Sequence, residues 1–146
     1  MQESKKKYLF AGLGTMGYPM AGHLSKNKDF DLYVYNRTDE VADKWLNQHD
    51  GSKFILNNSP NLKFHGLIIC LKDDHSIVDL LVNKKLLSYL NKNSFIIDLA
   101  KQNNFLLYYL QIHLELNLLK YLIIFYLINN VFPIFQELTN DQFHFL

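Results

Sequence analysis

Three glycines near the start of the chain have the spacing of a phosphate-binding turn. Gly12, Gly14 and Gly17 directly follow the apolar run 8–11 and precede a stretch compatible with a helix. In such a strand–turn–helix, the first glycine permits the tight turn and the second lets the backbone approach a pyrophosphate. The third lets the helix lie close to the strand. The first helical turn, beyond Thr15, would offer unpaired N–H groups to the phosphates. The pattern therefore predicts a site for a dinucleotide.

A second group of polar residues indicates which dinucleotide would bind. About 20 residues past the glycines, a site that prefers NAD usually carries Asp or Glu, which accepts a hydrogen bond from the ribose 2′-hydroxyl. This chain has Asn36, Arg37 and Thr38 there. A neutral amide does not repel a 2′-phosphate, and a guanidinium can bind one through two hydrogen bonds. The segment favours NADP over NAD; the alternative is that Arg37 is an ordinary surface residue and Thr38 only a helix cap.

The elements that must position these residues follow from the first hundred residues, where strand and helix signals alternate. Apolar and β-branched runs predict strands at 7–11, 31–36, 53–56, 67–71 and 94–99. Helical spacing predicts helices at 16–26, 38–50 and 77–84, with a short helical segment through Leu62 and Phe64 and a polar turn at 73–75. Alternation of this kind is typical of an α/β fold with a doubly wound parallel sheet, a Rossmann-like domain.

Composition sets further bounds. The net charge of +1 gives no electrostatic reason to expect a nucleic acid partner. A single cysteine, Cys70, excludes an internal disulfide and fits a reducing compartment. Glu3 and the early glycines do not fit a signal peptide. We therefore expect a cytoplasmic protein, with Cys70 as a small core residue.

The composition changes abruptly near residue 100. Residues 101–146 contain no Gly, Ala, Ser, Arg or Met and are dominated by Leu, Ile, Phe, Tyr and Asn. We expect a dinucleotide-binding domain at 1–100 and a divergent hydrophobic tail at 101–146. Residues 110–118 alternate as in a strand, whereas their leucine content favours a helix. The apolar run 121–128 is too short to span a bilayer, so a core or interface segment is favoured over a membrane span. If the tail is an interface segment, two or more copies of the chain could associate through it as a homo-oligomer.

Two segments together carry a resemblance to a known family. Residues 10–24 read FAGLGTMGYPMAGHL, and residues 34–38 read VYNRT. They resemble the amino-terminal part of the β-hydroxyacid dehydrogenases, which include 3-hydroxyisobutyrate, tartronate semialdehyde and 6-phosphogluconate dehydrogenases. The resemblance extends to about residue 99 and implies a domain that binds NADP or, less well, NAD.

The resemblance also implies roles for individual residues. The backbone from Leu13 to Met16 would cradle the pyrophosphate, and the loop after the fourth strand, Leu71-Lys72, would pass under the cofactor. The family usually has Leu-Pro in that loop, so the rigid turn of a proline is lost here. The predicted cofactor-binding residues are Gly12, Leu13, Gly14, Thr15, Met16, Gly17, Asn36, Arg37, Thr38, Leu71 and Lys72.

The parts of the family that do chemistry on a substrate have no counterpart in this sequence. The substrate motif Asp-Ala-Pro-Val-Ser-Gly-Gly is missing, and neither Lys101 nor Lys120 lies in a motif matching the catalytic lysine. We assign no catalytic residue and no metal ligand.

Three hypotheses remain, in this order. The first is an NADP(H)-binding domain that is truncated and catalytically incomplete, with a frame change as one origin of the tail. The second is an active NADPH-dependent reductase of short hydroxyacids or aldehyde acids, completed by dimerisation. The third is a non-enzymatic nucleotide-binding module whose tail anchors it to a membrane or a partner.

Overall fold

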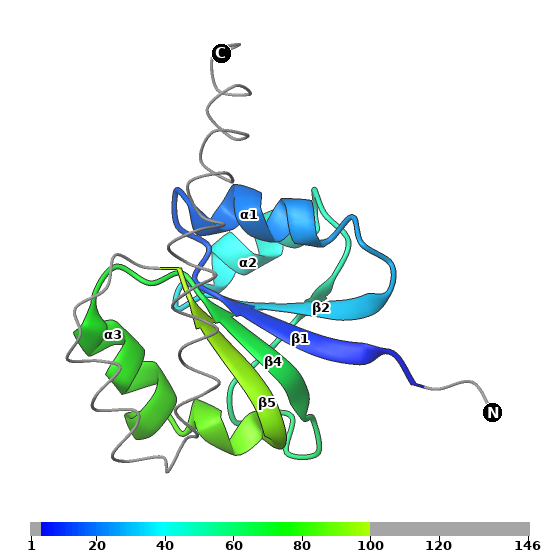
Figure 1. The fold of residues 1–146 in the computed structure, drawn as a ribbon. Helices are drawn as coiled ribbons and strands as arrows, with labels where there is room; N and C mark the ends of the chain where they lie inside the picture. The colour runs from blue at the N-terminus through cyan, green and yellow to red at the C-terminus, as the bar shows by residue number, and fades with distance from the viewer. Residues whose placement is uncertain (1–3, 100–146) are drawn as a thin grey trace. The chain divides into compact units, whose positions relative to one another are not determined.

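The computed structural model describes residues 4–99, which form a parallel five-stranded sheet with helical segments on both faces (Figure 1). The strands are β1 (Lys6–Ala11), β2 (Phe30–Tyr35), β3 (Ser52–Lys53), β4 (Phe64–Ile69) and β5 (Leu90–Asp98). The helices are α1 (Gly17–Leu24), α2 (Asp39–Leu46) and α3 (Asp74–Val78), followed by a π-helical turn (Asp79–Asn83) and a 3₁₀ turn (Leu86–Tyr89). The strand order is β3-β2-β1-β4-β5. The predicted doubly wound, Rossmann-like fold is confirmed.

Each face of the sheet has its own apolar core. On one face Phe10 and Val34 of the sheet pack with Ala21 of α1 and Trp45 of α2. On the opposite side lies α3 (Figure 1), whose Ile77 is fully buried. Strands covered on both faces are apolar at consecutive positions. This explains why the end of β1 reads as a continuous apolar run.

The order of the strands creates one switch point. β1 pairs in parallel with β2 on one side and with β4 on the other. The chain therefore winds outward in one direction from β1 to β3 and in the other from β4 to β5. In open α/β sheets, ligands bind at the carboxyl ends of the strands where the winding direction reverses. The loops that follow β1, β2 and β4 meet at this place.

Trp45 holds α2 against α1. It is the single tryptophan of the chain, and its side chain is fully buried. Its indole Nε1 donates a hydrogen bond to the carbonyl oxygen of Tyr18, 3.1 Å away. The next turn of chain packs closely as well, because a Cβ at Gly51 would lie 3.0 Å from the Trp45 ring. The helices beside the glycine turn are thus fixed to each other.

The segment before β4 corrects two predictions. Phe64 does not belong to a helix with Leu62; it is the first residue of β4 and is fully buried. The strand therefore starts earlier than the predicted 67–71 and ends at Ile69. Gly66 interrupts the apolar pattern from which the start of this strand would be predicted. The ring of Phe95 on β5 lies over Gly66, so close that a Cβ there would be 2.3 Å from it. An aromatic ring covering a strand glycine replaces the missing side chain.

Other boundaries differ at the outer strands. β3 consists of Ser52–Lys53 rather than 53–56, and the positive φ of Asn57 (66°) turns the chain shortly after it. β5 begins at Leu90 rather than 94, because the polar residues 91–93 read as a loop but extend the strand. The predictions for the tail, including 110–118 and 121–128, lie outside the described residues. Within residues 4–99, no helix has both the length and the apolar character needed to span a membrane.

Candidate functional site

Gly12 closes the turn at the end of β1 and cannot be replaced without strain. Its φ is +105°, in the region that favours glycine. Its N–H donates to the carbonyl oxygen of Tyr35 at 2.9 Å, which ties the turn to β2. On the other side, a Cβ would lie 2.2 Å from the carbonyl oxygen of Cys70, at the end of β4. The turn therefore sits wedged between the ends of two strands.

Gly17 and Gly14 are glycines for different reasons. A Cβ at Gly17 would lie 1.9 Å from the carbonyl oxygen of Gly12, so α1 can begin this close to β1 only with glycine there. Gly14 has an ordinary φ, and a Cβ there would meet nothing within 4 Å. Nothing within residues 4–99 requires glycine at position 14. Open space lies beside Gly14, and the role of the second glycine in approaching a diphosphate stays a prediction.

Asn36, directly after β2, makes two hydrogen bonds to the backbone. Its Oδ1 accepts from the N–H of Leu13 at 2.9 Å, and its Nδ2 donates to the carbonyl oxygen of Thr38 at 3.1 Å. Thr38 lies at the N-cap position of α2, as predicted, but its side chain makes no capping hydrogen bond. Arg37 between them is exposed.

These residues line a cleft at the carboxyl ends of the strands, with a volume of about 510 Å³. Most of the predicted cofactor-binding residues lie on it. They are Gly12, Gly14, Asn36, Arg37, Thr38, Leu71 and Lys72. Of the rest, Leu13 and Gly17 are buried, and Thr15 and Met16 are exposed at the start of α1. The structure thus brings together the glycine turn, the end of β2 and the loop after β4.

The far wall of the cleft was missed by the sequence prediction. It is formed by α3 and the π-helical turn, which contribute Asp73, His75, Ser76, Asp79, Leu80 and Lys84. Their position directly after β4 is the signal that could have found them, since a helix that follows a strand at the switch point borders the ligand crevice.

The predicted polar turn at 73–75 is in fact the start of a helix. The Oδ1 of Asp73 accepts from the N–H of Ser76 at 2.8 Å, the usual bond of an N-cap, and this bond lowers the pKa of Asp73. The pKa of Asp79 is also lowered, first by a hydrogen bond from Asn83 and then by Lys84. The Nζ of Lys84 lies 3.3 Å from the Asp79 carboxylate. The carboxylates on this wall are thus already engaged.

Cys70 lies where the two walls meet. Burial raises the pKa of its thiol, and the nearby carboxylate of Asp98 raises it further. The protonated thiol is the stable form at neutral pH. Cys70 was predicted as a core residue, but it is half-buried: it packs against the apolar core and also lines the cleft. Among residues 4–99, no three His, Cys, Asp or Glu side chains are grouped as ligands of a metal ion.

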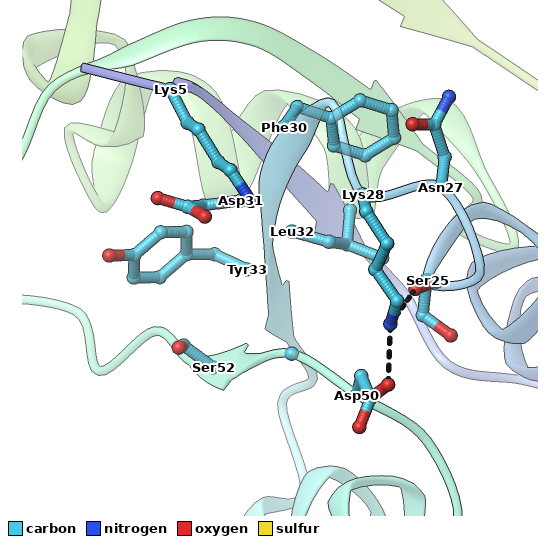
Figure 2. Close-up of a pocket in the computed structure, with 11 residues that line it drawn as sticks. Lys5, Ser25, Asn27, Lys28, Phe30, Asp31, Leu32, Tyr33, Asp50 and Ser52 are labelled. Carbon is cyan, nitrogen blue, oxygen red and sulfur yellow. Dashed lines mark hydrogen bonds and ion pairs between the residues drawn. The ribbon is translucent and has the colours of Figure 1, made fainter. Parts of the chain in front are cut away.

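A second hollow, of about 370 Å³, lies at the opposite, amino-terminal end of β2 (Figure 2). One ion pair joins two of its lining side chains. The Nζ of Lys28 lies 2.6 Å from Asp50 and 3.5 Å from the carbonyl oxygen of Ser25. None of the predicted cofactor-binding residues lines this hollow.

Solved structures of other proteins share this fold over about three quarters of the chain. The 3-hydroxyisobutyrate dehydrogenase of Mycobacterium tuberculosis superposes with a TM-score of 0.62 at 16% identity, covering 74% of this chain and 36% of that one. An imine reductase from a Pseudomonas species gives 0.59 at 21% identity, covering 77% and 38%. The chain thus spans little more than a third of the length of these structures.

Sequence similarity identifies the family. An uncharacterised oxidoreductase of Shewanella frigidimarina is 53% identical over 47 residues, which are 32% of this chain and 16% of that protein. Residues 7–105 match the family described as the NAD-binding domain of 6-phosphogluconate dehydrogenase. This match covers more than half of the chain and includes the glycine turn, Arg37 and both walls of the cleft. The chain therefore belongs to the family of the NAD-binding domain of 6-phosphogluconate dehydrogenase.

Proposed function

We propose that this chain binds NADP(H) in the cleft and acts as the cofactor-binding part of an oxidoreductase. The observation that carries the proposal is the position of Arg37, which is exposed on the cleft beside the glycine turn. Within the described part of the chain it forms no ion pair. Its guanidinium is therefore available for a phosphate, which it can bind through two hydrogen bonds.

The charges around Arg37 support NADP as the preferred form. Asn36 stands where a carboxylate would repel a 2′-phosphate. Lys72 adds a second cation to the same cleft. The carboxylate of Asp79 on the far wall is held by Asn83 and Lys84, so its charge is partly compensated. A ligand with an additional phosphate gains more from this environment than one without.

The roles of the remaining residues follow from their places. The exposed N–H groups at the start of α1, from Gly14 to Met16, would hold the diphosphate. Arg37 and Thr38 would hold the 2′-phosphate, and Leu71 and Lys72 would border the cofactor from the end of β4. When bound, the nicotinamide would supply the hydride acceptor or donor of an oxidation or reduction.

Calorimetric titration of the purified chain with NADPH and with NADH tests the proposal. Arg37→Ala should weaken NADPH by roughly 1.5–3 kcal/mol and leave NADH nearly unchanged, because only the 2′-phosphate contact is lost. Arg37→Lys should be intermediate, since it keeps the charge and loses the two-point contact. Lys44→Ala, an exposed cation on α2 outside the cleft, is the matched control. An equal loss for both nucleotides would contradict the preference for NADP.

We also infer that residues 101–146 do not supply the substrate-binding half of the reaction. The change in composition near residue 100 and the end of the family match at residue 105 support this. No turnover of NADPH with short aldehyde acids is then expected. Translation of the coding DNA in the other frames beyond codon 100 should recover the motif Asp-Ala-Pro-Val-Ser-Gly-Gly if a frame change produced the tail. Turnover would instead favour a reductase completed by dimerisation.

A further inference from the structure

Asn36 joins two loops that both face the cleft, and its position suggests a role other than contact with the nucleotide. We propose that Asn36 is a positioning residue: it clamps the glycine turn to the end of β2 and occupies the N–H of Leu13, so that this amide does not bind the diphosphate. The effect on affinity rests on the proposed function, whereas the clamp exists in the protein without nucleotide.

The two hydrogen bonds of Asn36 fix which way its amide points. The oxygen faces the N–H of Leu13 at 2.9 Å, and the nitrogen faces the carbonyl of Thr38 at 3.1 Å. Turning the amide over would place two donors together on one side and two acceptors on the other. The arrangement therefore uses both the acceptor and the donor of the carboxamide.

The clamp adds one hydrogen bond to those that join the end of β1 to the end of β2. Gly12 N–H donates to the carbonyl of Tyr35 at the end of β2, and the next amide along, that of Leu13, donates to Asn36. On the other side of the turn, the N–H of Cys70 donates to the carbonyl of Ala11 at 2.8 Å. The turn is thus held from both neighbouring strands, and the side chain of Asn36 supplies the last bond.

The clamp also decides which amides remain for a ligand. Within residues 4–99, the N–H groups of Gly14, Thr15 and Met16 donate to no carbonyl or side chain. The N–H of Leu13 does donate, and the residue is buried. Diphosphate recognition then falls to the amides at the start of α1, without that of Leu13.

An acidic residue at position 36 would lose the bond to Thr38, one of the two bonds of the clamp. A carboxylate could still accept from Leu13, but its second oxygen would face the carbonyl oxygen of Thr38, and two acceptors repel each other. The amide is therefore required by the loops themselves, besides sparing a 2′-phosphate the repulsion of a negative charge.

Amide hydrogen exchange of the full chain without nucleotide tests the clamp directly. Asn36→Leu, similar in size but without hydrogen bonds, should speed exchange at Leu13 by about tenfold or more and leave Phe10 in β1 unchanged. Asn36→Asp, which keeps an acceptor, should retain part of the protection. Asn27→Leu is the matched control, because Asn27 also accepts a backbone N–H, that of Asp29 at 2.7 Å, but lies outside the cleft. Fast exchange at Leu13 in the unmodified protein would overturn the proposal.

Two nucleotide fragments separate positioning from contact. ADP carries a diphosphate without a 2′-phosphate, and 2′-AMP carries the 2′-phosphate alone. Asn36→Leu should weaken ADP, NADH and NADPH by a similar factor, about tenfold, and leave 2′-AMP within about twofold. Arg37→Ala should instead weaken 2′-AMP and NADPH, which carry the 2′-phosphate, and leave ADP and NADH nearly unchanged. An equal loss for 2′-AMP and ADP would overturn the positioning role. If the unmodified protein binds none of these nucleotides, the proposed function fails, and the exchange at Leu13 still decides the clamp.

Discussion

The two walls of the cleft are built on different principles. On the glycine side, the position of the chain is set by backbone packed on backbone, with 2.2 Å and 1.9 Å left for a Cβ at Gly12 and Gly17. On the α3 side, it is set by caps and ion pairs of partly exposed side chains such as Asp73 and the Asp79–Lys84 pair. At Gly12 and Gly17 the first wall can change only with a large loss of stability. The second can exchange residues at small cost, and is where binding preferences can be adjusted.

The largest effect is expected at Gly12. Gly12→Ala forces a side chain into a positive-φ position and against the Cys70 carbonyl. The free energy of unfolding should fall by about 3 kcal/mol or more, because backbone strain and a backbone clash add. Urea denaturation followed by circular dichroism measures it. A loss below about 1 kcal/mol would show that the glycine wall is as adaptable as the other.

Gly14→Ala makes the same chemical change on the same wall without the clash. We expect the free energy of unfolding to stay within about 0.5 kcal/mol of the unmodified value, because the new Cβ meets open space. Affinity for NADPH and NADH should fall equally, by about tenfold, since the methyl group takes up room needed by the diphosphate. Calorimetry and urea denaturation on one sample give both quantities. Unchanged affinity would mean that the ligand does not approach position 14.

On the α3 wall, removing the cap at Asp73 should have a moderate effect. Asp73→Ala loses the bond to Ser76 and should lower the Tm by roughly 3–6 °C at neutral pH. Because the pKa of Asp73 is lowered in the folded state, its contribution is present above the ordinary carboxyl pKa and is lost as the pH falls through the lower, folded value. The difference between the two proteins should therefore shrink in acid. Asp73→Asn keeps a capping oxygen and should show less of this pH dependence.

The smallest expected effect concerns Cys70, between the walls. Because the pKa of its thiol is raised, alkylation by iodoacetamide at pH 7 should be at least about threefold slower than that of a free cysteine. The rate should rise as the pH increases, and urea-unfolded protein serves as the reference. An alkylation rate equal to that of the unfolded reference would show that the Cys70 thiol is open to solvent. It would contradict the burial of the thiol between the two walls.

The glycine wall was largely predictable from the sequence and the α3 wall was not. Gly12, Gly14 and Gly17 act through local backbone geometry, so their spacing carries the information by itself. The side chains of Asp79 and Lys84 reach the cleft only because α3 packs on the sheet after β4, a tertiary fact without a local signal. For Asn36, too, the sequence did not reveal the tertiary contacts. Its place near the cofactor site was predicted, but its bonds to Leu13 and Thr38 depend on how two loops meet.

The errors in strand boundaries have a similar cause. β4 was predicted too late because Gly66 and His65 interrupt the apolar pattern, and the ring that covers Gly66 comes from Phe95, distant in the sequence. β5 was predicted too short because residues 91–93 are polar. Where each strand begins depends partly on pairing between β4 and β5, in which Gly66 pairs with Phe95 and Phe64 with Leu90. Periodicity alone does not contain that information.

The burial of Trp45 gives the protein an intrinsic optical probe. A solitary indole enclosed between α1 and α2 emits at short wavelength, and its emission should move to the red when water reaches it. Because the chain has only one such chromophore, fluorescence reports on the half of the sheet that carries the glycine turn. Comparing that signal with circular dichroism during denaturation would show whether the two halves of the sheet come apart together or in sequence.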